Sequence, residues 1–93
     1  MMVGYSEDKE SLIKRLARIE GQVRGVSRMV EEDRYCIEIL DQVSAIKKAL
    51  EKTAMFLLRD HLDHCVVNAI KSDKKQGQDK LDEALLAIER LVK

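Results

Sequence analysis

The sequence has no proline, no tryptophan and only 4 glycines among its 93 residues. Aromatic residues make up only 3% of the chain, so it lacks the aromatic platforms on which proteins stack unpaired bases. Sheet proteins are usually rich in aromatic and turn residues, and this scarcity argues against them. The recurrent Leu, Ile, Lys, Glu and Ala favour long amphipathic helices instead.

Long apolar runs are also absent. No segment approaches the roughly 20 consecutive apolar residues of a transmembrane helix. Segment 6–10 is polar and of mixed charge, unlike the apolar core of a signal peptide. We therefore expect a cytoplasmic protein without a membrane partner, in which the two cysteines are thiols rather than a structural disulfide.

The net charge is zero, but the charges are segregated along the chain. Residues 14–28 carry five basic side chains and one acidic one, and residues 45–59 carry four basic and one acidic. Residues 31–41, between them, carry five acidic side chains and one basic. This pattern suits an assembly with one positive face, although a basic run is more often only a solvated helix face.

The first part of the chain predicts a long helix. It starts at Ser6, a capping hydroxyl followed by two acidic residues, and ends in the polar stretch 31–34. Its apolar seam has heptad spacing and consists of Leu12, Leu16, Ile19, Val23, Val26 and Val30. Gly21 and Gly25 each cost about 1 kcal/mol of helix propensity relative to Ala. Their spacing of four places them on one face, where a neighbouring backbone can approach closely.

A second long helix is expected from about Cys36 to about Lys71, because no Gly or Pro interrupts this stretch. Segment 72–78 is expected to be a linker, and a short third helix follows it. The predicted fold is all-α, with three helices (long, long, short) in one domain that spans residues 1–93. No pair of short helices has the tight turn of a helix-turn-helix.

His61 and Cys65 are four residues apart on the second helix, so both side chains lie on one face and can bind one ion. The spacing is common and alone it is weak evidence. A buried Cys is often just a small hydrophobe, and a His on an apolar stripe is often a core residue with a hydrogen-bond partner. Both explanations stay open for this pair.

Cys36 lies on the same stripe at the other end of the same helix, 29 residues from Cys65. That separation is roughly 43 Å in an unbroken helix, so the two thiols cannot share an ion within one chain. Two copies packed antiparallel would bring each Cys36 to the partner's His61 and Cys65, with a two-fold axis near Ala49 and Leu50. The three ligands therefore predict an antiparallel helical-bundle dimer with two equivalent metal sites.

Two thiolates and one imidazole suit a soft ion, and Cu(I) fits this set. Zn(II) also binds Cys and His, but structural zinc usually has four protein ligands. A fourth could come from His64 or from the start of the chain; His64 points about 100° away from Cys65, and we interpret it as a surface residue.

Four motifs, which together extend over nearly the whole chain, resemble the copper-sensing operon repressor family of small, all-helical bacterial regulators. They are Arg15-Leu-Ala-Arg-Ile-Glu-Gly-Gln-Val-Arg-Gly25, Tyr35-Cys36, Gln42-Val-Ser-Ala45 and His61-Leu-Asp-His-Cys65. Within that family the Cys–His–Cys pattern is similar to the Cu(I)-sensing branch. Nickel and cobalt sensors have His in place of Cys65 and another His near the N-terminus, formaldehyde sensors have Pro in place of Met2, and persulfide sensors lack the His.

The resemblance implies further roles. Tyr35 and Glu83 would hydrogen-bond the metal-bound His61, since the second ring nitrogen of a ligand His usually needs a partner. Glu83 as an ordinary solvated charge remains the alternative. Family members are dimers of dimers and bind operator DNA; the implied contacts here are Lys14, Arg15, Arg18 and Lys52.

The predicted function is a Cu(I)-responsive transcriptional repressor whose apo form binds operator DNA. Cu(I) binding at the intersubunit site would release the DNA and derepress copper-resistance genes. The alternatives are a metal buffer or chaperone without DNA binding, a sibling repressor that senses another metal or reactive sulfur species, and a purely structural helical bundle. No nucleophile–base–orienter set is visible, so an enzyme is not expected.

Overall fold

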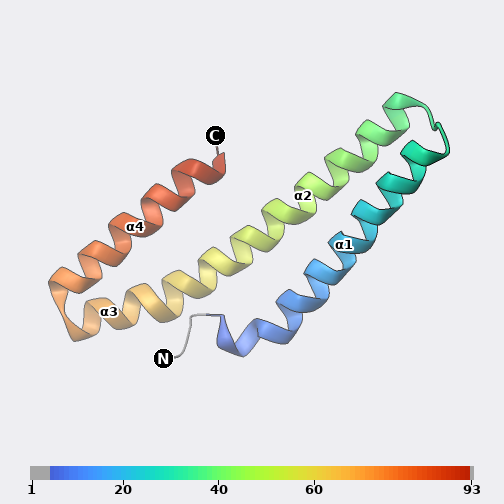
Figure 1. Cartoon of the computed structure of the whole chain (residues 1–93). Coiled ribbons are helices and arrows are strands. Elements are labelled where there is room, and N and C mark those ends of the chain that lie inside the picture. The colour runs from blue at the N-terminus through green and yellow to red at the C-terminus, as the bar shows by residue number, and fades with distance from the viewer. Residues whose placement is uncertain (1–4, 93) are drawn as a thin grey trace. The chain divides into compact units, whose positions relative to one another are not determined.

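The computed structural model describes residues 5–92, and every element in that range is helical (Figure 1). The elements are the 3-10 turn η1 (Ser6–Asp8), α1 (Lys9–Glu31), α2 (Cys36–Asp60), the π-helical turn η2 (His61–Val66), α3 (Val67–Ser72) and α4 (Lys74–Val92). Because α2, η2 and α3 follow one another without a break, they form one helical run. The prediction of an all-α chain with three helices is confirmed.

The chain divides into two compact units, each considered by itself below. One is the hairpin of α1 and most of α2, residues 9–55; the other comprises residues 56–92 with the segment 5–8. Among residues 5–92, no helix is both long and apolar enough to cross a membrane.

A tight turn ends α1 and reverses the chain into an antiparallel hairpin (Figure 1). Asp33 adopts φ 56°, its N–H donates to the Val30 carbonyl at 3.1 Å, and the Arg34 N–H donates to the Met29 carbonyl at 3.0 Å. This pair of hydrogen bonds is a Schellman motif, which satisfies two of the free carbonyls at the helix end. The new helix begins two residues later at Cys36, as expected.

The break between the second and third helices is much shorter than the predicted linker 72–78, which is wrong. Asp73 alone is extended, with φ −157° and ψ 121°, and α4 begins at Lys74. The Asp73 carboxylate accepts a hydrogen bond from the Lys75 N–H at 3.1 Å, so it caps α4. The polar composition that suggested a loop therefore belongs to a capped helix start.

Gly77 is buried in the first turns of α4, where α4 packs on α3. A Cβ atom at this position would lie 2.6 Å from the Cα of Ile70, which is much closer than atoms can pack. The glycine is therefore required for the close approach of the two helices, and it sets the distance between α3 and α4.

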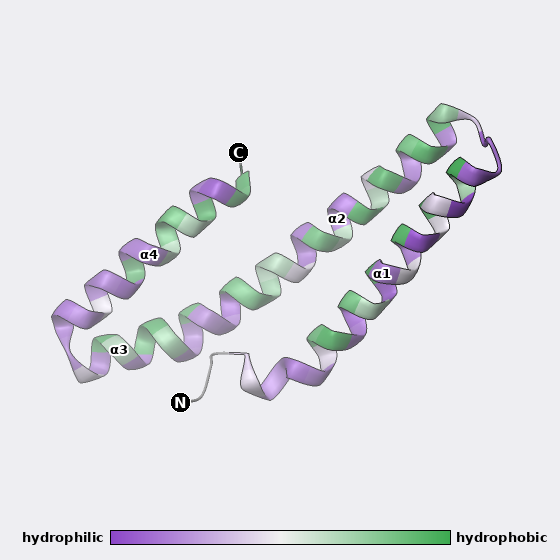
Figure 2. Ribbon diagram, viewed as in Figure 1, coloured by the Kyte–Doolittle hydropathy of each residue, from purple (hydrophilic) through white to green (hydrophobic). Residues whose placement is uncertain are grey.

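Little side-chain surface is buried in a single chain. The buried residues are Leu12 and Ile19 of α1, Thr53 of α2, and Val66, Ala69, Gly77 and Ala84 of the C-terminal unit. Large apolar residues stay exposed along every long helix, visible as green bands in Figure 2; on the hairpin they include Leu16, Val23, Val30, Leu40, Val43 and Leu50. The helices of one chain thus leave much of their apolar surface uncovered.

Candidate metal centre and nucleic-acid interface

The predicted ligands His61 and Cys65 both belong to the π-helical turn η2. Its backbone bonds reach one residue further than those of an α-helix: the Val67 N–H donates to the Leu62 carbonyl. Four residues are just under one turn of this widened helix, so His61 and Cys65 lie on the same side. Both are partly buried, and Cys65 is a free thiol. The turn thus offers two donor atoms, an imidazole nitrogen and a thiol sulfur, close enough along the helix for one ion.

The other polar residues of this turn differ from that pair in their surroundings. His64 and Asp63 are exposed, which agrees with the interpretation of His64 as a surface residue. Asp60, immediately before the turn, has its pKa raised above 3.8 by desolvation, by a hydrogen bond with the Asp8 carboxyl group and by the charge of Asp8, against a smaller lowering by His64. A carboxyl group therefore neighbours the ligand pair without forming part of it.

Cys36 is the first residue of α2, and it is exposed as a free thiol. His61, the first residue of the turn that contains the other two ligands, lies 25 positions after Cys36 along the helical run. A helix of that length extends about 37 Å, which is far beyond the span of any coordination sphere. In agreement, no group of three or more His, Cys, Asp or Glu is placed to hold a metal ion anywhere in residues 5–92 of one chain.

Two residues were assigned by resemblance to a hydrogen-bonding role beside His61. Tyr35 directly precedes Cys36, is 69% exposed, and its carbonyl accepts the N–H groups of Glu38 and Ile39 at the start of α2. Glu83 is exposed on α4, next to the buried Ala84. A contact from either side chain to His61 stays a prediction, as does the metal-ligand set itself. Met2, which distinguishes the chain from formaldehyde sensors, lies outside the described residues.

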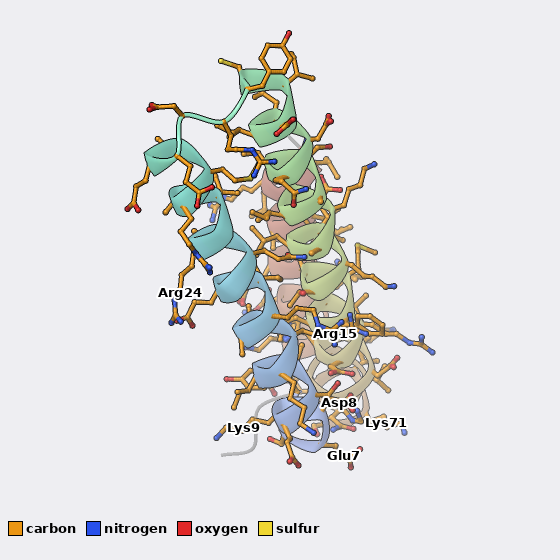
Figure 3. The ribbon with its side chains drawn as sticks, turned by 90° about the vertical axis from the view of Figure 1, so that its right-hand side faces the viewer. Glu7, Asp8, Lys9, Arg15, Arg24 and Lys71 are labelled. Atoms are coloured by element: carbon orange, nitrogen blue, oxygen red, sulfur yellow. The ribbon has the colours of Figure 1, made fainter. Side chains whose placement is uncertain are left out.

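The predicted DNA contacts all belong to the hairpin of residues 9–55. Lys14 and Arg18 are exposed on the side of α1 opposite its apolar seam. Arg15 is partly buried on the flank of α1, between the seam and that opposite side. Figure 3 shows the Arg15 and Arg24 side chains leaving α1 on opposite sides. Lys52 is exposed on the polar side of α2. The hairpin therefore presents cations on both helices, while their role in DNA binding stays a prediction.

The sequence reasoning missed the π-helical register of residues 61–66. Nothing in composition or spacing distinguishes this segment from the α-helix around it, because the apolar stripe continues through it at intervals of three and four. π-Helical turns are rare and are often found at functional sites. Only the backbone coordinates could have revealed that the ligand pair occupies such a turn.

Residues 8–90 match the model of a known family, described as the metal-sensitive transcriptional repressor. This match extends over nearly all of the chain, and the chain therefore belongs to that family. It is a family of gene regulators and not of enzymes.

Two characterised relatives are similar over nearly their full length. The copper-sensing transcriptional repressor RicR of Mycobacterium tuberculosis (strain ATCC 25618 / H37Rv) is 50% identical over 90 residues, which are 97% of this chain and 94% of the relative. The copper-sensing transcriptional repressor CsoR of Bacillus subtilis (strain 168) is 47% identical over 88 residues, which are 95% of this chain and 85% of the relative.

Two solved structures with the same fold belong to regulators that respond to different metals. The crystal structure of the copper-sensing repressor CsoR with Cu(I) from Geobacillus thermodenitrificans NG80-2 matches with a TM-score of 0.88 and 47% identity, covering 100% of this chain and 95% of the other. The nickel-responsive transcriptional regulator InrS matches with a TM-score of 0.75 and 36% identity, covering 88% and 90%. Because one fold carries both copper and nickel responses, the ligand residues must decide the ion.

Proposed function

We propose that this chain is a Cu(I)-responsive transcriptional repressor whose metal site is shared between two subunits. The observation that carries the proposal is the separation of its three ligands. His61 and Cys65 lie together in η2, whereas Cys36 lies at the far end of the 25-residue helix α2. Relatives at 50% and 47% identity are named as copper-sensing repressors, which supports the same signal here.

The donor set fits a soft monovalent ion. Cys36 and Cys65 are both free thiols, exposed or partly exposed, and each can lose its proton to become a thiolate ligand. His61 contributes a neutral imidazole. When bound, Cu(I) supplies a soft cation that these two sulfurs and one nitrogen satisfy without a fourth ligand. A nickel site of the usual kind would require harder nitrogen or oxygen donors.

The exposed apolar surface of the hairpin supports the antiparallel dimer that the ligands require. Leu50 lies at the midpoint between Cys36 and the pair His61 and Cys65, and it is 47% exposed in a single chain. Val43, two turns before Leu50, is 45% exposed, and Leu57, two turns after it and just beyond the hairpin, is 42% exposed. Pairing two such helices about an axis near Leu50 would cover these residues and bring each Cys36 to the partner's ligands. Two such dimers would form the tetramer.

Repression and release then follow from the thermodynamic linkage between Cu(I) binding and DNA binding. The apo assembly binds operator DNA through Lys14, Arg15, Arg18 and Lys52, and the filled site favours a conformation that binds DNA less well. His61 transmits the change through Tyr35 and Glu83. An allosteric coupling of about 1–3 kcal/mol changes operator affinity by about 5- to 150-fold, and DNA must weaken Cu(I) binding by the same factor.

Operator affinity with and without Cu(I) is the direct test. Fluorescence anisotropy of a duplex selected from a random-sequence library should show tight binding by the apo protein and at least a fivefold loss at one Cu(I) per subunit. X-ray absorption should find two sulfur neighbours and one nitrogen neighbour around the ion. Unchanged operator affinity on saturation with Cu(I) would contradict the copper-release mechanism.

Mixed dimers test the shared site. Neither Cys36→Ala nor Cys65→Ala alone should hold Cu(I) tightly. When the two variants are co-refolded, each mixed dimer contains one site with Cys36 from one subunit and His61 and Cys65 from the other. Tight binding should therefore return at one ion per mixed dimer. A site built within one chain would show no such recovery.

A metal buffer that never binds DNA would need the same three ligands but no basic hairpin surface. Arg18→Gln separates these functions, because Arg18 is exposed on α1 and far along the sequence from every ligand. The variant should bind Cu(I) as the parent does and bind the selected duplex more weakly. If the parent protein selects no duplex at all, the buffer function is favoured.

A further inference from the structure

One face of α1 has no role in the packing of the hairpin formed by residues 9–55. Residues at spacings of four and three define an outer ridge on this helix, namely Lys14, Arg18, Gly21, Gly25 and Arg28. At 100° of rotation per residue this ridge lies directly opposite the apolar seam that contains the buried Leu12 and Ile19. The ridge therefore faces away from the hairpin's own interior.

The cations of the ridge are available to a partner. Lys14, Arg18 and Arg28 are exposed, and no ion pair involves any of them in the part of the chain that the structure describes. Arg24, one turn before Arg28, differs: it projects to the flank and forms an ion pair with Glu20 (Figure 3). Three of the ridge's five positions are thus unpaired positive charges.

The two remaining positions are glycines that the chain itself does not require. A Cβ atom at Gly21 or Gly25 would meet no atom within 4 Å, and neither residue has a positive φ. Gly77 shows the contrast, because Ile70 leaves no space for a Cβ there. Glycine inside a helix is unfavourable relative to Ala, and neither the exposed Gly21 nor the partly buried Gly25 has a contact in the chain that requires it, so their presence calls for something outside the chain that approaches α1 closely.

From this arrangement we propose that the outer ridge of α1 seats the sugar–phosphate backbone of duplex DNA. Lys14 and Arg18 hold phosphates at one end of the glycine pair, Arg28 holds phosphates at the other, and Gly21 and Gly25 let the strand approach the helix between them. The ridge extends roughly 21 Å from Lys14 to Arg28, which matches the axial length of about six base pairs along one strand. The proposal rests on the proposed repressor function, and it adds Arg28, Gly21 and Gly25 to the DNA-contacting surface.

Charge favours DNA over a protein partner on this face. The unpaired side chains of the ridge are all cationic, and Ser11 and Gln22, exposed beside it, are uncharged polar residues; the exposed acidic residue in line with the ridge, Glu10, lies one turn before Lys14. A second copy of the chain would instead be expected on the apolar residues left exposed elsewhere on the hairpin, such as Leu16 and Val23. Contact of the ridge with another subunit is therefore an outcome for the experiment to exclude.

Arg28→Gln and Arg24→Gln form a matched pair, one turn apart on the same helix with the same loss of charge. Loss of one phosphate contact should weaken binding of the apo protein to its selected duplex by roughly fivefold at 0.15 M salt, and lower the slope of log affinity against log salt by about 0.9 for each ridge in contact. We expect this from Arg28→Gln and a smaller change from Arg24→Gln. Equal effects of the two variants would overturn the assignment of Arg28.

Gly21→Ala supplies a second test with opposite effects on stability and binding. The Ala variant should melt at a temperature at least as high as that of the parent protein, because it favours the helix. It should nevertheless bind the selected duplex less tightly, while Cu(I) stoichiometry and sedimentation mass stay unchanged. Full operator affinity in Gly21→Ala would overturn the proposal, and a changed mass would assign the ridge to a subunit interface instead. If the parent protein binds no duplex, the repressor function fails rather than the ridge alone.

Discussion

The two compact units of the chain differ in how closely their helices pack. In residues 56–92, α3 and α4 approach so closely that Gly77 lies against the Ile70 backbone, and Val66, Ala69 and Ala84 are buried in this unit. In residues 9–55, α1 and most of α2 bury only Leu12, Ile19 and Thr53. Small residues thus close the contact between α3 and α4 in the C-terminal unit, but large apolar residues stay exposed in both units, for example Leu86 at 55% and Leu40 at 58%.

This contrast matches the division of the candidate site. The predicted ligands His61 and Cys65 lie in the C-terminal unit, where η2 packs on α4. The predicted ligand Cys36 is exposed at the start of α2, in the hairpin. The two parts of the predicted site thus differ in burial, because Cys36 is exposed while His61 and Cys65 are partly buried.

The largest effect is expected from the ligands that the two units contribute. Cys36→Ala in the hairpin and Cys65→Ala in the C-terminal unit should each lower Cu(I) affinity by more than about 100-fold. Even the loss of a residue that hydrogen-bonds a metal ligand typically lowers metal affinity by about 10- to 100-fold. Competition with a chromophoric Cu(I) chelator measures both. His64→Ala, which removes an exposed neighbour in the same turn, should change little. If only one of the two cysteine variants lowered Cu(I) affinity, the prediction that both cysteines are ligands of one ion would be wrong.

Assembly should depend on the hairpin's apolar stripe. Leu50→Glu places a charge at the expected two-fold axis, where each dimer carries it twice, and should raise the dimer dissociation constant by about 100-fold or more. Sedimentation equilibrium measures the change. Ala45→Glu is the matched control, since Ala45 is exposed on the opposite side of α2. A dimer that survives Leu50→Glu unchanged would place the interface elsewhere.

Glycine-to-alanine changes should have opposite signs in the two units. Gly77→Ala must push α4 away from the Ile70 backbone and should destabilise the protein by about 1–3 kcal/mol, despite the better helix propensity of Ala. Gly25→Ala meets no atom within 4 Å and should stabilise the helix by up to about 1 kcal/mol. Thermal melting resolves the difference, because 1 kcal/mol shifts the midpoint by about 4–8 °C in a domain of this size. Destabilisation by both variants would mean that Gly25 is in close contact too.

The smallest effects are expected from the surface ion pairs of the two units. Arg34 and Glu38, at the hairpin turn, are 2.8 Å apart and half exposed, so Arg34→Ala should cost no more than about 0.5 kcal/mol. Arg59 and Asp63 are 3.9 Å apart and more exposed, so Arg59→Ala should have no measurable effect. Urea titrations of both variants test this order, and a loss above 1 kcal/mol from either would reveal a contact beyond the pair.

Most of the fold could be predicted because the apolar residues of an amphipathic helix recur every three or four positions, on the face that is buried. The end of α1 near residues 31–34 and the start of α2 at Cys36 both agree with the structure. The linker at 72–78 was wrong, because Asp, Lys and Gln are common both in loops and in the first turn of a helix. A capping hydrogen bond from one carboxylate, that of Asp73, is what decided between them.

The separation of Cys36 from His61 and Cys65 was determined by the sequence alone, since helix rise depends only on residue count, and the prediction of a second subunit rests on that separation. So was the soft character of the donor set. Only the tertiary structure decided that the ligand pair occupies a π-helical turn and that Gly77 is a close contact while Gly21 and Gly25 face open space. Those features depend on which part of the backbone lies opposite a residue in the folded chain. The order of residues along one helix does not specify such contacts.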